Sequence, residues 1–546
     1  MGNFEILPRD RSENRGSLSP LGGRNLRLKE FQTSRGALLL TVSQGIAIFV
    51  GFAIHVGLTR LLSPEFYGLY AVTISVLMWG ELLITGTIGT AFPKALSECS
   101  VSAKEIWRWT WQVYLPLWLV LWFLFSAASW GIASLLRDVR LMPLLLVAAS
   151  ELPFFGIYIA ARSSLQGLMA YGWMSVLLSL WALLRLFIIF AFVFATQSVL
   201  GVMVGNTVAV AITALLAIAI LRPFLKTGSA RADFGSAGAS PSETHCTDFG
   251  SAGAEPSEAH RTPISLLVGI GLPTLAITLL DQILLALDLW ILKRMSVPEF
   301  SGFYGAARFF AFALLMLASG LGSAWFPAMC HELGKGERER AKALLREAMR
   351  VLILGLFPFV VIVWATARPL SVLLFSGSFE LTAEPMRCLV IAISLFTFMG
   401  FMRGALIADN KFRLPVILGV MMTALDFLLC YLLIPRYGML GAAWATTVTS
   451  AFGLIAMWVP TALRFGDFVP IATLVRVAVA SFVLWLIAVF WSASGLILLV
   501  QYLLLGVVYI LALIALGELK SSDWQVLRVT IGSIVADVTT VLRIRR

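Results

Sequence analysis

The string LLSPEFYGLY at residues 61–70 returns almost unchanged as MSVPEFSGFY at 295–304, and this duplication decides the fold. At one constant offset, five identical positions pair the two strings: Pro64, Glu65, Phe66, Gly68 and Tyr70 with Pro298, Glu299, Phe300, Gly302 and Tyr304. Arg60 and Arg294, each directly before its string, match at the same offset. The register continues without a gap from Gly86, Phe92, Pro93 and Glu98 to Gly320, Phe326, Pro327 and Glu332. The sequence therefore predicts two copies of one structural unit.

The composition is that of a polytopic membrane protein. Of the residues, 59% are apolar and 13% are charged, and the mean hydropathy is +0.90. Because lipid offers the backbone no hydrogen-bond partners, spans of about 20 apolar residues must be helices, and the fold class is all-α. We count fourteen such spans, near 37–59, 68–91, 109–135, 141–161, 173–195, 199–221, 264–292, 303–329, 351–375, 386–408, 414–435, 438–463, 472–492 and 495–516.

The spans divide the chain into six segments. Each copy of the repeat holds six spans, an even number, so both copies enter the membrane in the same direction as a parallel repeat. The linker between them contains DFGSAGASPSE at 233–243 and a near copy, DFGSAGAEPSE, at 248–258, a composition that cannot bury a core. The segments are a basic tail (1–36), an N-terminal bundle (37–221), a flexible linker (222–263), a C-terminal bundle (264–465), two accessory helices (466–516) and a tail with an interfacial amphipathic helix (517–546).

Basic residues predict the orientation in the membrane. The first 36 residues are rich in Arg and lack the apolar core of a removable signal peptide. Most of the 41 Lys and Arg residues fall in the two tails and in alternate loops, so both termini are expected on the cytoplasmic side of the cytoplasmic (inner) membrane. This asymmetry accounts for the net charge of +11 without a nucleic-acid partner, and it indicates contact with anionic membrane lipids.

On this topology the two PEF strings lie in short external turns. Pro fixes the backbone where one helix ends, Glu can sit at the positive N-terminus of the next helix, and Gly permits a tight turn. We favour a structural role for these hairpins over a gate that also contacts substrate.

Several classes of function are disfavoured by what the sequence lacks. Its five cysteines and four histidines are scattered and show no metal-ligand spacing, so neither a disulfide framework nor a metal site is expected. No phosphate-binding Gly-Lys-Ser/Thr loop is present, and the external loops leave little room for a catalytic site. We therefore expect a protein that is not an enzyme, with no catalytic residues and no cofactor.

Ionisable residues inside the spans are the main candidates for function, since burying a charge in hydrocarbon is costly. Asp281 and Asp288 share one helical face with Thr274 and Thr278. This stripe either lines a solvated path and binds a coupling cation or proton, or it holds helices together with each Asp paired to an Arg.

The remaining candidates carry similar alternatives. Arg185 lies near mid-depth, and the repeat places Asp426 at the equivalent point, so the two either form an ion pair or leave Arg185 as an anion site. Glu81 is comparably deep and favours a cavity role, whereas Arg308 is close enough to a helix end to reach water. Lys94 is expected to anchor the interface by default; Gln44 and His55 share a helical face with Gly51, where packing is the ordinary role for His55.

Four strings carry a resemblance to a known family. RLLSPEFYGLYAVTISV, LDLWILKRMSVPEFSGFYGAAR, ARPLSVLLFSGSFE and LLIPRYGMLGAAWATTVTS occur in order between about 37 and 465. Together they resemble polysaccharide (O-antigen type) flippases of the multidrug/oligosaccharidyl-lipid/polysaccharide exporter superfamily. The resemblance implies two six-helix lobes forming a V around a cavity, with two additional helices outside.

Such flippases move undecaprenyl-pyrophosphate-linked oligosaccharides by alternating access for surface or extracellular polysaccharide synthesis. The resemblance implies that Arg185, Arg308 and Lys94 attract the pyrophosphate, while Glu81, Asp281 and Asp288 shape the cavity or bind a coupling ion; it also allows for other polysaccharide-assembly proteins as partners. The chain departs from the peptidoglycan-precursor flippases in having few Arg in its first two spans. Two alternatives stay open: an ion-coupled multidrug antiporter of the same superfamily, and a membrane glycan polymerase or ligase.

Overall fold

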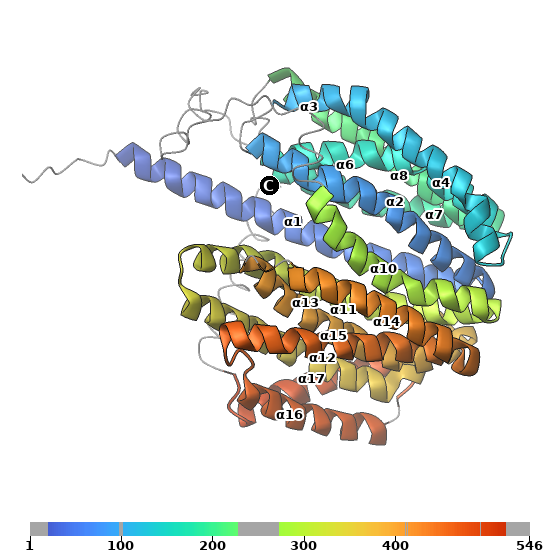
Figure 1. The fold of residues 1–546 in the computed structure, drawn as a ribbon, viewed down its shortest axis with the longest axis vertical. Helices are drawn as coiled ribbons and strands as arrows, with labels where there is room; N and C mark the ends of the chain where they lie inside the picture. Colours follow the sequence, from blue (N-terminus) through green and yellow to red (C-terminus); the bar gives the residue numbers. More distant parts are fainter. Residues whose placement is uncertain are drawn as a thin grey trace, which may run out of the picture.

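The chain forms an all-helical membrane protein (Figure 1). The computed structural model describes residues 20–97, 102–227, 272–409, 411, 413–491 and 493–519, and within these ranges it contains no strand. Thirteen of its segments are long and apolar enough to cross a membrane. The one predicted span outside these thirteen, 264–292, begins outside the described ranges and continues as α10 (Leu272–Met295). The predicted fold class is confirmed.

The first half of the chain folds into one bundle. In it α1 packs on α7, α7 on α8, and α2 on α6. A π-helical turn at Thr110–Tyr114 joins α3 to α4, so that these segments act as one span, and α5 and α6 together make another. The helices are α1 (Pro20–Leu61), α2 (Pro64–Ser97), α3 (Ala103–Trp109), α4 (Leu115–Leu135), α5 (Leu141–Ala149), α6 (Leu152–Gly167), α7 (Tyr171–Thr196) and α8 (Val199–Thr227).

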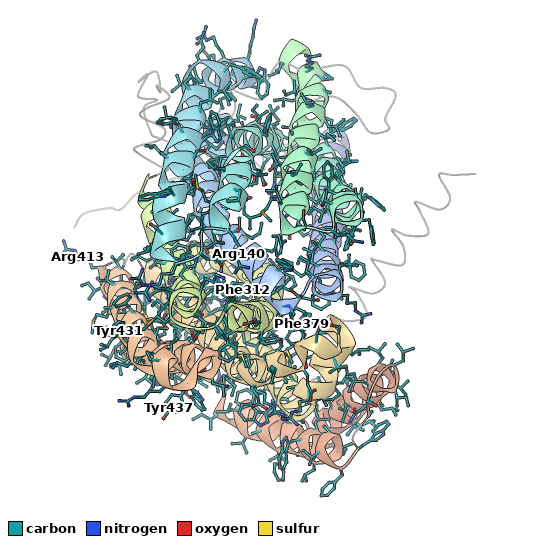
Figure 2. All side chains as sticks on the ribbon, turned by 90° about the vertical axis from the view of Figure 1, so that its right-hand side faces the viewer. Arg140, Phe312, Phe379, Arg413, Tyr431 and Tyr437 are labelled. Atoms are coloured by element: carbon teal, nitrogen blue, oxygen red, sulfur yellow. The ribbon has the colours of Figure 1, made fainter. Side chains whose placement is uncertain are left out.

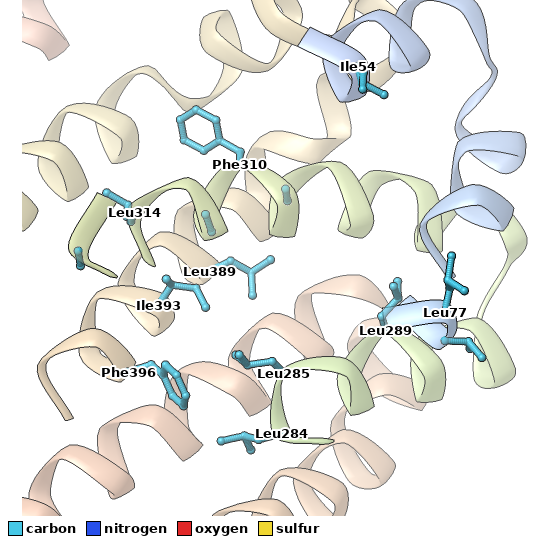
Figure 3. Packing of buried hydrophobic residues seen from close by; sticks show 14 of the residues in the cluster. Ile54, Leu77, Leu284, Leu285, Leu289, Phe310, Leu314, Leu389, Ile393 and Phe396 are labelled. Atoms are coloured by element: carbon cyan, nitrogen blue, oxygen red, sulfur yellow. The ribbon is translucent and has the colours of Figure 1, made fainter. Parts of the chain in front are cut away.

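The second half forms a corresponding bundle. Here α13 packs on α15, α14 on α15, and α11 on α13. Figure 3 shows how leucine, isoleucine and phenylalanine side chains of α10, α11 and α13 fill the space between these helices, among them Leu285, Phe310 and Ile393. Besides α10, its elements are α11 (Pro298–Gly334), α12 (Arg338–Phe375), the 3-10 helix η3 (Gly377–Thr382), α13 (Ala383–Ala408), α14 (Arg413–Tyr437) and α15 (Met439–Phe465).

Two boundaries differ from the sequence-based expectation. Helix α1 begins at Pro20, so the second half of the expected basic tail is helical and continuous with the first span. Helix α8 continues to Thr227, into the predicted linker. The rest of that linker, and the predicted amphipathic helix after residue 519, lie outside the described residues.

The PEF strings begin helices. Pro64 and Pro298 are the first residues of α2 and α11, a position where the missing N–H of proline costs nothing. Only Leu62 and Ser63 separate the acidic first turn of α2 from the body of α1. Gly68 and Gly302 therefore lie inside helices, and the expectation that they form tight turns was wrong. We call the end of the molecule that carries the α1–α2 and α10–α11 turns the hairpin end.

Two further helices, α16 (Ile471–Phe490) and α17 (Ile497–Ala515), pack beside α12 at the edge of the second bundle (Figure 1). A buried carboxylate fastens them. Glu518 accepts hydrogen bonds from Arg350 of α12 at 3.0 Å, from Arg476 of α16 at 2.9 Å and from Thr473 at 2.7 Å. Burial raises the pKa of Glu518, but these three donors outweigh it and lower the pKa below the ordinary Glu range. The carboxylate therefore stabilises the docked pair above that range and loses this effect as the pH falls through the lowered pKa.

We expect Glu518→Gln to lower the free energy of unfolding by roughly 3 kcal/mol, because Arg350 would keep its burial and lose its buried charged partner. Heat denaturation in detergent micelles measures the change. Glu347→Gln is the matched control: Glu347 also pairs with Arg350, at 3.1 Å, but its side chain is 58% exposed. Its loss should cost at most about 1 kcal/mol. Equal effects of the two substitutions would contradict this account.

Candidate functional site

Asp288 of α10 lies at the centre of a polar cluster in the second bundle. Its side chain is buried and accepts hydrogen bonds from the hydroxyl groups of Tyr304 (α11) and Thr446 (α15), the latter at 3.2 Å. The guanidinium of Arg308 stands 3.9 Å from the other carboxylate oxygen and 4.9 Å from the ring of Phe312. Arg308 is itself buried, so it does not reach water at the helix end.

A second carboxylate, Asp426 of α14, lies near Asp288 and has no exposed surface. The thiol of Cys430 approaches its Oδ2 at 3.8 Å. Within the described ranges, neither its Oδ1 nor Oγ1 of the neighbouring Thr449 forms a hydrogen bond of regular geometry, although the two side chains lie close to each other. Two carboxylates and nearby hydroxyl oxygens with unused lone pairs are the ligand types that hard cations prefer.

Asp281 has a different environment from Asp288, although both belong to α10. Both of its oxygens pair with the guanidinium of Arg403 of α13, with Nη2 at 2.7 Å from Oδ2. About a fifth of each side chain is exposed. Each Asp of the predicted stripe is therefore paired with an Arg, Asp281 with Arg403 and Asp288 with Arg308, and Asp288 has hydroxyl partners in addition. The side chain of Thr274 lies outside the described residues.

Arg185 of α7 belongs to a separate network in the first bundle. Its Nε donates to Asn206 of α8 at 2.8 Å, and the amide of Asn206 donates in turn to Glu151 at the start of α6. Asn206 and Glu151 are buried, and the carboxyl group of Glu81 of α2 lies within hydrogen-bonding range of that of Glu151. Sequence reasoning identified Arg185 and Glu81 but missed Asn206 and Glu151.

The ion pair expected between Arg185 and Asp426 is not formed. The two residues occupy different bundles, and each has its own partners there. The repeat made them equivalent in position, and equivalence under a repeat does not bring two residues into contact. Glu151 could have been noticed, since it is a carboxylate inside the predicted span 141–161.

The other predicted residues lie on α1 and α2. His55 stacks on Phe309 of α11 with ring centroids 3.6 Å apart, and its Nδ1 hydrogen-bonds with the hydroxyl of Tyr67 at 2.8 Å. His55 thus packs between the bundles. Gln44 is exposed. Lys94 belongs to α2, but its side chain lies outside the described residues.

The two bundles meet closely at the hairpin end, where the repeated glycines face each other. A Cβ on Gly302 would overlap the carbonyl oxygen of Pro64, and a Cβ on Gly68 would overlap Ser301 and the backbone of Gly302. Deeper along α2, Ser75 accepts a hydrogen bond from Trp290 of α10 at 2.7 Å. The glycines of the repeat therefore permit helix contact between the bundles.

Ion pairs and charged hydrogen bonds surround this contact. Lys293 of α10 pairs with Asp138 of the α4–α5 turn at 2.8 Å, and Asp138 also accepts from Arg140 at 3.0 Å. Arg140 lies where the two bundles meet (Figure 2). Burial raises the pKa of Asp138, but the hydrogen bonds from Arg140 and Lys293 outweigh it and lower the pKa to about 2. Across the interface, Arg60 donates to the carbonyl groups of Leu373 and Leu374, and Arg294 to that of Leu135.

Comparison with known proteins assigns the chain to a transporter family. The family model described as lipid II flippase MurJ matches residues 169–517, and no curated protein matches the chain. A structure of lipid II flippase MurJ in an inward closed conformation superposes with a TM-score of 0.65 at 13% identity, covering 87% of this chain and 98% of that one. An inward-facing multidrug resistance MATE family transporter of the MOP superfamily gives a TM-score of 0.59 at 13% identity, covering 79% of this chain and 99% of that one. At these identities the likeness to solved structures establishes the fold.

Proposed function

Because this chain belongs to the lipid II flippase MurJ family, we propose that it carries a lipid-linked saccharide across the cytoplasmic membrane by alternating access of its two bundles. Moving sugar hydroxyls and a pyrophosphate through hydrocarbon would cost several kcal/mol for each unpaired polar group. A passage between the bundles removes this cost, while the lipid tail stays in the bilayer. The observation that carries the proposal is the closed contact at the hairpin end, with Gly68 and Gly302 at its centre.

In this proposal the hairpin end faces the outside of the cell, and both termini face the cytoplasm. The distribution of Lys and Arg supports this orientation. The state with a closed hairpin end is then the one that receives substrate from the cytoplasmic leaflet. Release to the outer leaflet requires the contacts of Lys293, Arg60 and Arg294 across the interface to break.

Lipid II is the first substrate to test, since it is the one that the family description names. A polysaccharide precursor is the second, because Arg60 is the only Lys or Arg between residues 37 and 93, and its side chain is at the hairpin end. An ordered set of strings shared with polysaccharide flippases supports this second substrate. The two differ in the saccharide and its peptide, so a transport assay can separate them.

A multidrug antiporter is the alternative that a specific observation favours. Asp288 and Asp426 form a buried acidic cluster, and acidic groups can bind cationic drugs. The fold is also shared with MATE transporters. Export of cationic drugs without movement of lipid-linked saccharides would decide for this alternative.

We further propose that a cation bound between Asp288 and Asp426 drives the cycle. Asp288 contacts Tyr304 and Arg308, which both belong to α11, the helix whose Gly302 packs on Pro64. A cation on Asp288 would compete with these two side chains and so alter the position of α11. Binding at the cluster is thereby linked to opening at the hairpin end.

We expect Asp138→Asn to shift the protein toward the state with an open hairpin end by about 2 kcal/mol or more, roughly thirtyfold, because buried Lys293 would lose its charged partner. Labelling of a cysteine placed at the hairpin end by a membrane-impermeant reagent measures the shift. The lowered pKa of Asp138 also predicts a pH dependence. The carboxylate of Asp138 stabilises the closed hairpin end fully at pH values above the ordinary pKa of Asp, near 4, and this stabilisation is lost only as the pH falls toward about 2. Unchanged labelling in Asp138→Asn would contradict the role of this pair.

Liposomes containing the purified protein and one defined substrate test the proposed function. The substrates are lipid II, a lipid-linked oligosaccharide without peptide, and a cationic drug. For the first two, an enzyme that modifies the saccharide is added outside, and the rate at which inner-leaflet substrate becomes accessible is recorded. Faster exposure of either lipid-linked substrate than in protein-free liposomes supports a flippase. If neither lipid-linked substrate becomes accessible faster than in protein-free liposomes, even under imposed ion gradients, the proposal is excluded.

A further inference from the structure

The first bundle contains a buried pair of carboxyl groups for which cation binding at Asp288 gives no explanation. Glu151 directly precedes α6 and is only 2% exposed, and Glu81 of α2 is partly buried. Their carboxyl groups lie within hydrogen-bonding range of each other. Two carboxylates are acceptors only, so a hydrogen bond between them requires a proton on one. Two like charges at this separation in a buried site would also repel strongly.

Hydrogen bonds connect this pair to the positive charge of Arg185, which acts through an amide. Asn206 donates to Glu151, and Arg185 donates to the oxygen of Asn206 at 2.8 Å. Within the described residues, Arg185 forms no ion pair within 4.0 Å of either carboxylate. One proton together with Arg185 balances the two carboxylates. The other titratable or charged groups that face the network are His55 of α1, Tyr70 of α2, and Tyr158 and Arg162 of α6.

Glu81 also lies close to the interface between the bundles. Trp79, two positions before it on α2, packs against Trp290 of α10 with ring centroids 5.5 Å apart. Ser75 on the same helix accepts the hydrogen bond from Trp290. A displacement of α2 around Glu81 would therefore be transmitted to contacts with the second bundle.

We propose that Glu81 and Glu151 form a proton-binding site that holds one shared proton while the hairpin end is closed and releases it when the bundles rearrange. The step is a transfer of a proton between water and a carboxylate oxygen, with no other bond made or broken. Loss of the proton leaves two carboxylates facing each other, and their repulsion favours separation of α2 from α6. A proton gradient would thus contribute to the cycle from the first bundle, beside the cation site of the second. This role rests on the proposed transport function; the presence of the shared proton does not.

Infrared difference spectroscopy on the purified full-length protein tests the site without reference to transport. We expect a C=O stretching band of a protonated carboxyl group that disappears as the pH is raised and shifts in heavy water. Glu81→Gln and Glu151→Gln should each remove this one band. Glu65→Gln is the matched control, since Glu65 pairs with Arg140 outside the network and its loss should leave the band unchanged.

Three outcomes decide between the possibilities. A band that does not change with pH in the wild-type protein would overturn the proposal, even if the variants fail to fold. A band that persists at full height in both Gln variants would also overturn it, because the proton would then belong to another group such as Asp426. A titrating band that both variants lose supports the site, and in the liposome assay a pH gradient should then raise the wild-type rate several-fold but not that of Glu151→Gln. If no lipid-linked substrate moves under any gradient, the transport function fails while the proton site stands.

Discussion

Gly302→Ala is expected to reduce translocation by at least roughly thirtyfold. The added Cβ would overlap the carbonyl oxygen of Pro64, a backbone atom of α2 that cannot rotate away. The closed contact at the hairpin end would therefore lose about 2 kcal/mol or more, and the protein would accumulate with that end open. Alanine is a better helix former than glycine by about 1 kcal/mol, so helix propensity cannot explain a loss. The liposome assay measures the rate, and external labelling measures the open fraction.

Gly322→Ala provides the control for this substitution. It lies on the same helix, but its Cβ would meet Phe401 at 3.8 Å, an ordinary van der Waals contact. This variant should transport at the wild-type rate. Gly68→Ala should reproduce the defect of Gly302→Ala, because it would overlap Ser301 and Gly302 from the opposite side. Normal transport by Gly302→Ala would show that the bundles do not need this contact.

Asp288→Asn is expected to weaken the apparent affinity for the coupling cation by at least about tenfold and to abolish stimulation by its gradient. The substitution removes a formal charge from the cluster while it preserves the size of the side chain, and cation affinity depends on the number of charged ligands. Tyr304 can still donate to the remaining carbonyl oxygen, so the packing between α10 and α11 should persist. Transport rates at increasing Na⁺ or K⁺ concentration measure the effect.

Asp281→Asn is the control that separates cation binding by Asp288 from a general effect of removing a negative charge from α10. Asp281 is on the same helix but is paired with Arg403. Its replacement should leave the cation affinity unchanged, although it weakens the link between α10 and α13. Asp426→Asn should instead behave like Asp288→Asn, since Asp426 is the second buried carboxylate of the same cluster. Equal loss of cation affinity in Asp281→Asn and Asp288→Asn would contradict a site confined to Asp288 and Asp426.

Features that depend on local composition and on the repeat could be predicted from the sequence. The all-helical membrane fold follows from apolar spans in a solvent without hydrogen-bond partners, and the matching PEF strings do begin corresponding helices, α2 and α11. The role of their glycines was misjudged, because a glycine that makes room for a neighbouring helix looks the same in sequence as a glycine in a tight turn. Only the placement of Pro64 against Gly302 shows that these glycines permit a close helix contact and do not form a turn.

Partners of buried charges could not be predicted, because they come from helices distant in sequence. Arg185 and Glu81 were recognised as unusual in their spans, but nothing local to them indicates Asn206 or Glu151. Asp281 and Asp288 share a helical face in the sequence, yet their partners differ: α13 provides an arginine to Asp281, whereas Asp288 receives a hydroxyl and an arginine from α11 and a hydroxyl from α15. Periodicity places a side chain on its own helix; the packing of the bundle determines what it meets.

Reversible locking of the hairpin end tests alternating access most directly. A Cβ on Gly305 would lie 2.8 Å from the Cβ of Ala71 across the interface, so a small backbone shift brings cysteines at these two positions into disulfide range. In liposomes with the accepted lipid-linked substrate, we predict that the Ala71→Cys/Gly305→Cys variant stops translocating when oxidised and recovers when reduced, while each single variant is unaffected by oxidation. Full-rate translocation by the oxidised double variant would contradict a cycle that opens the molecule at the hairpin end.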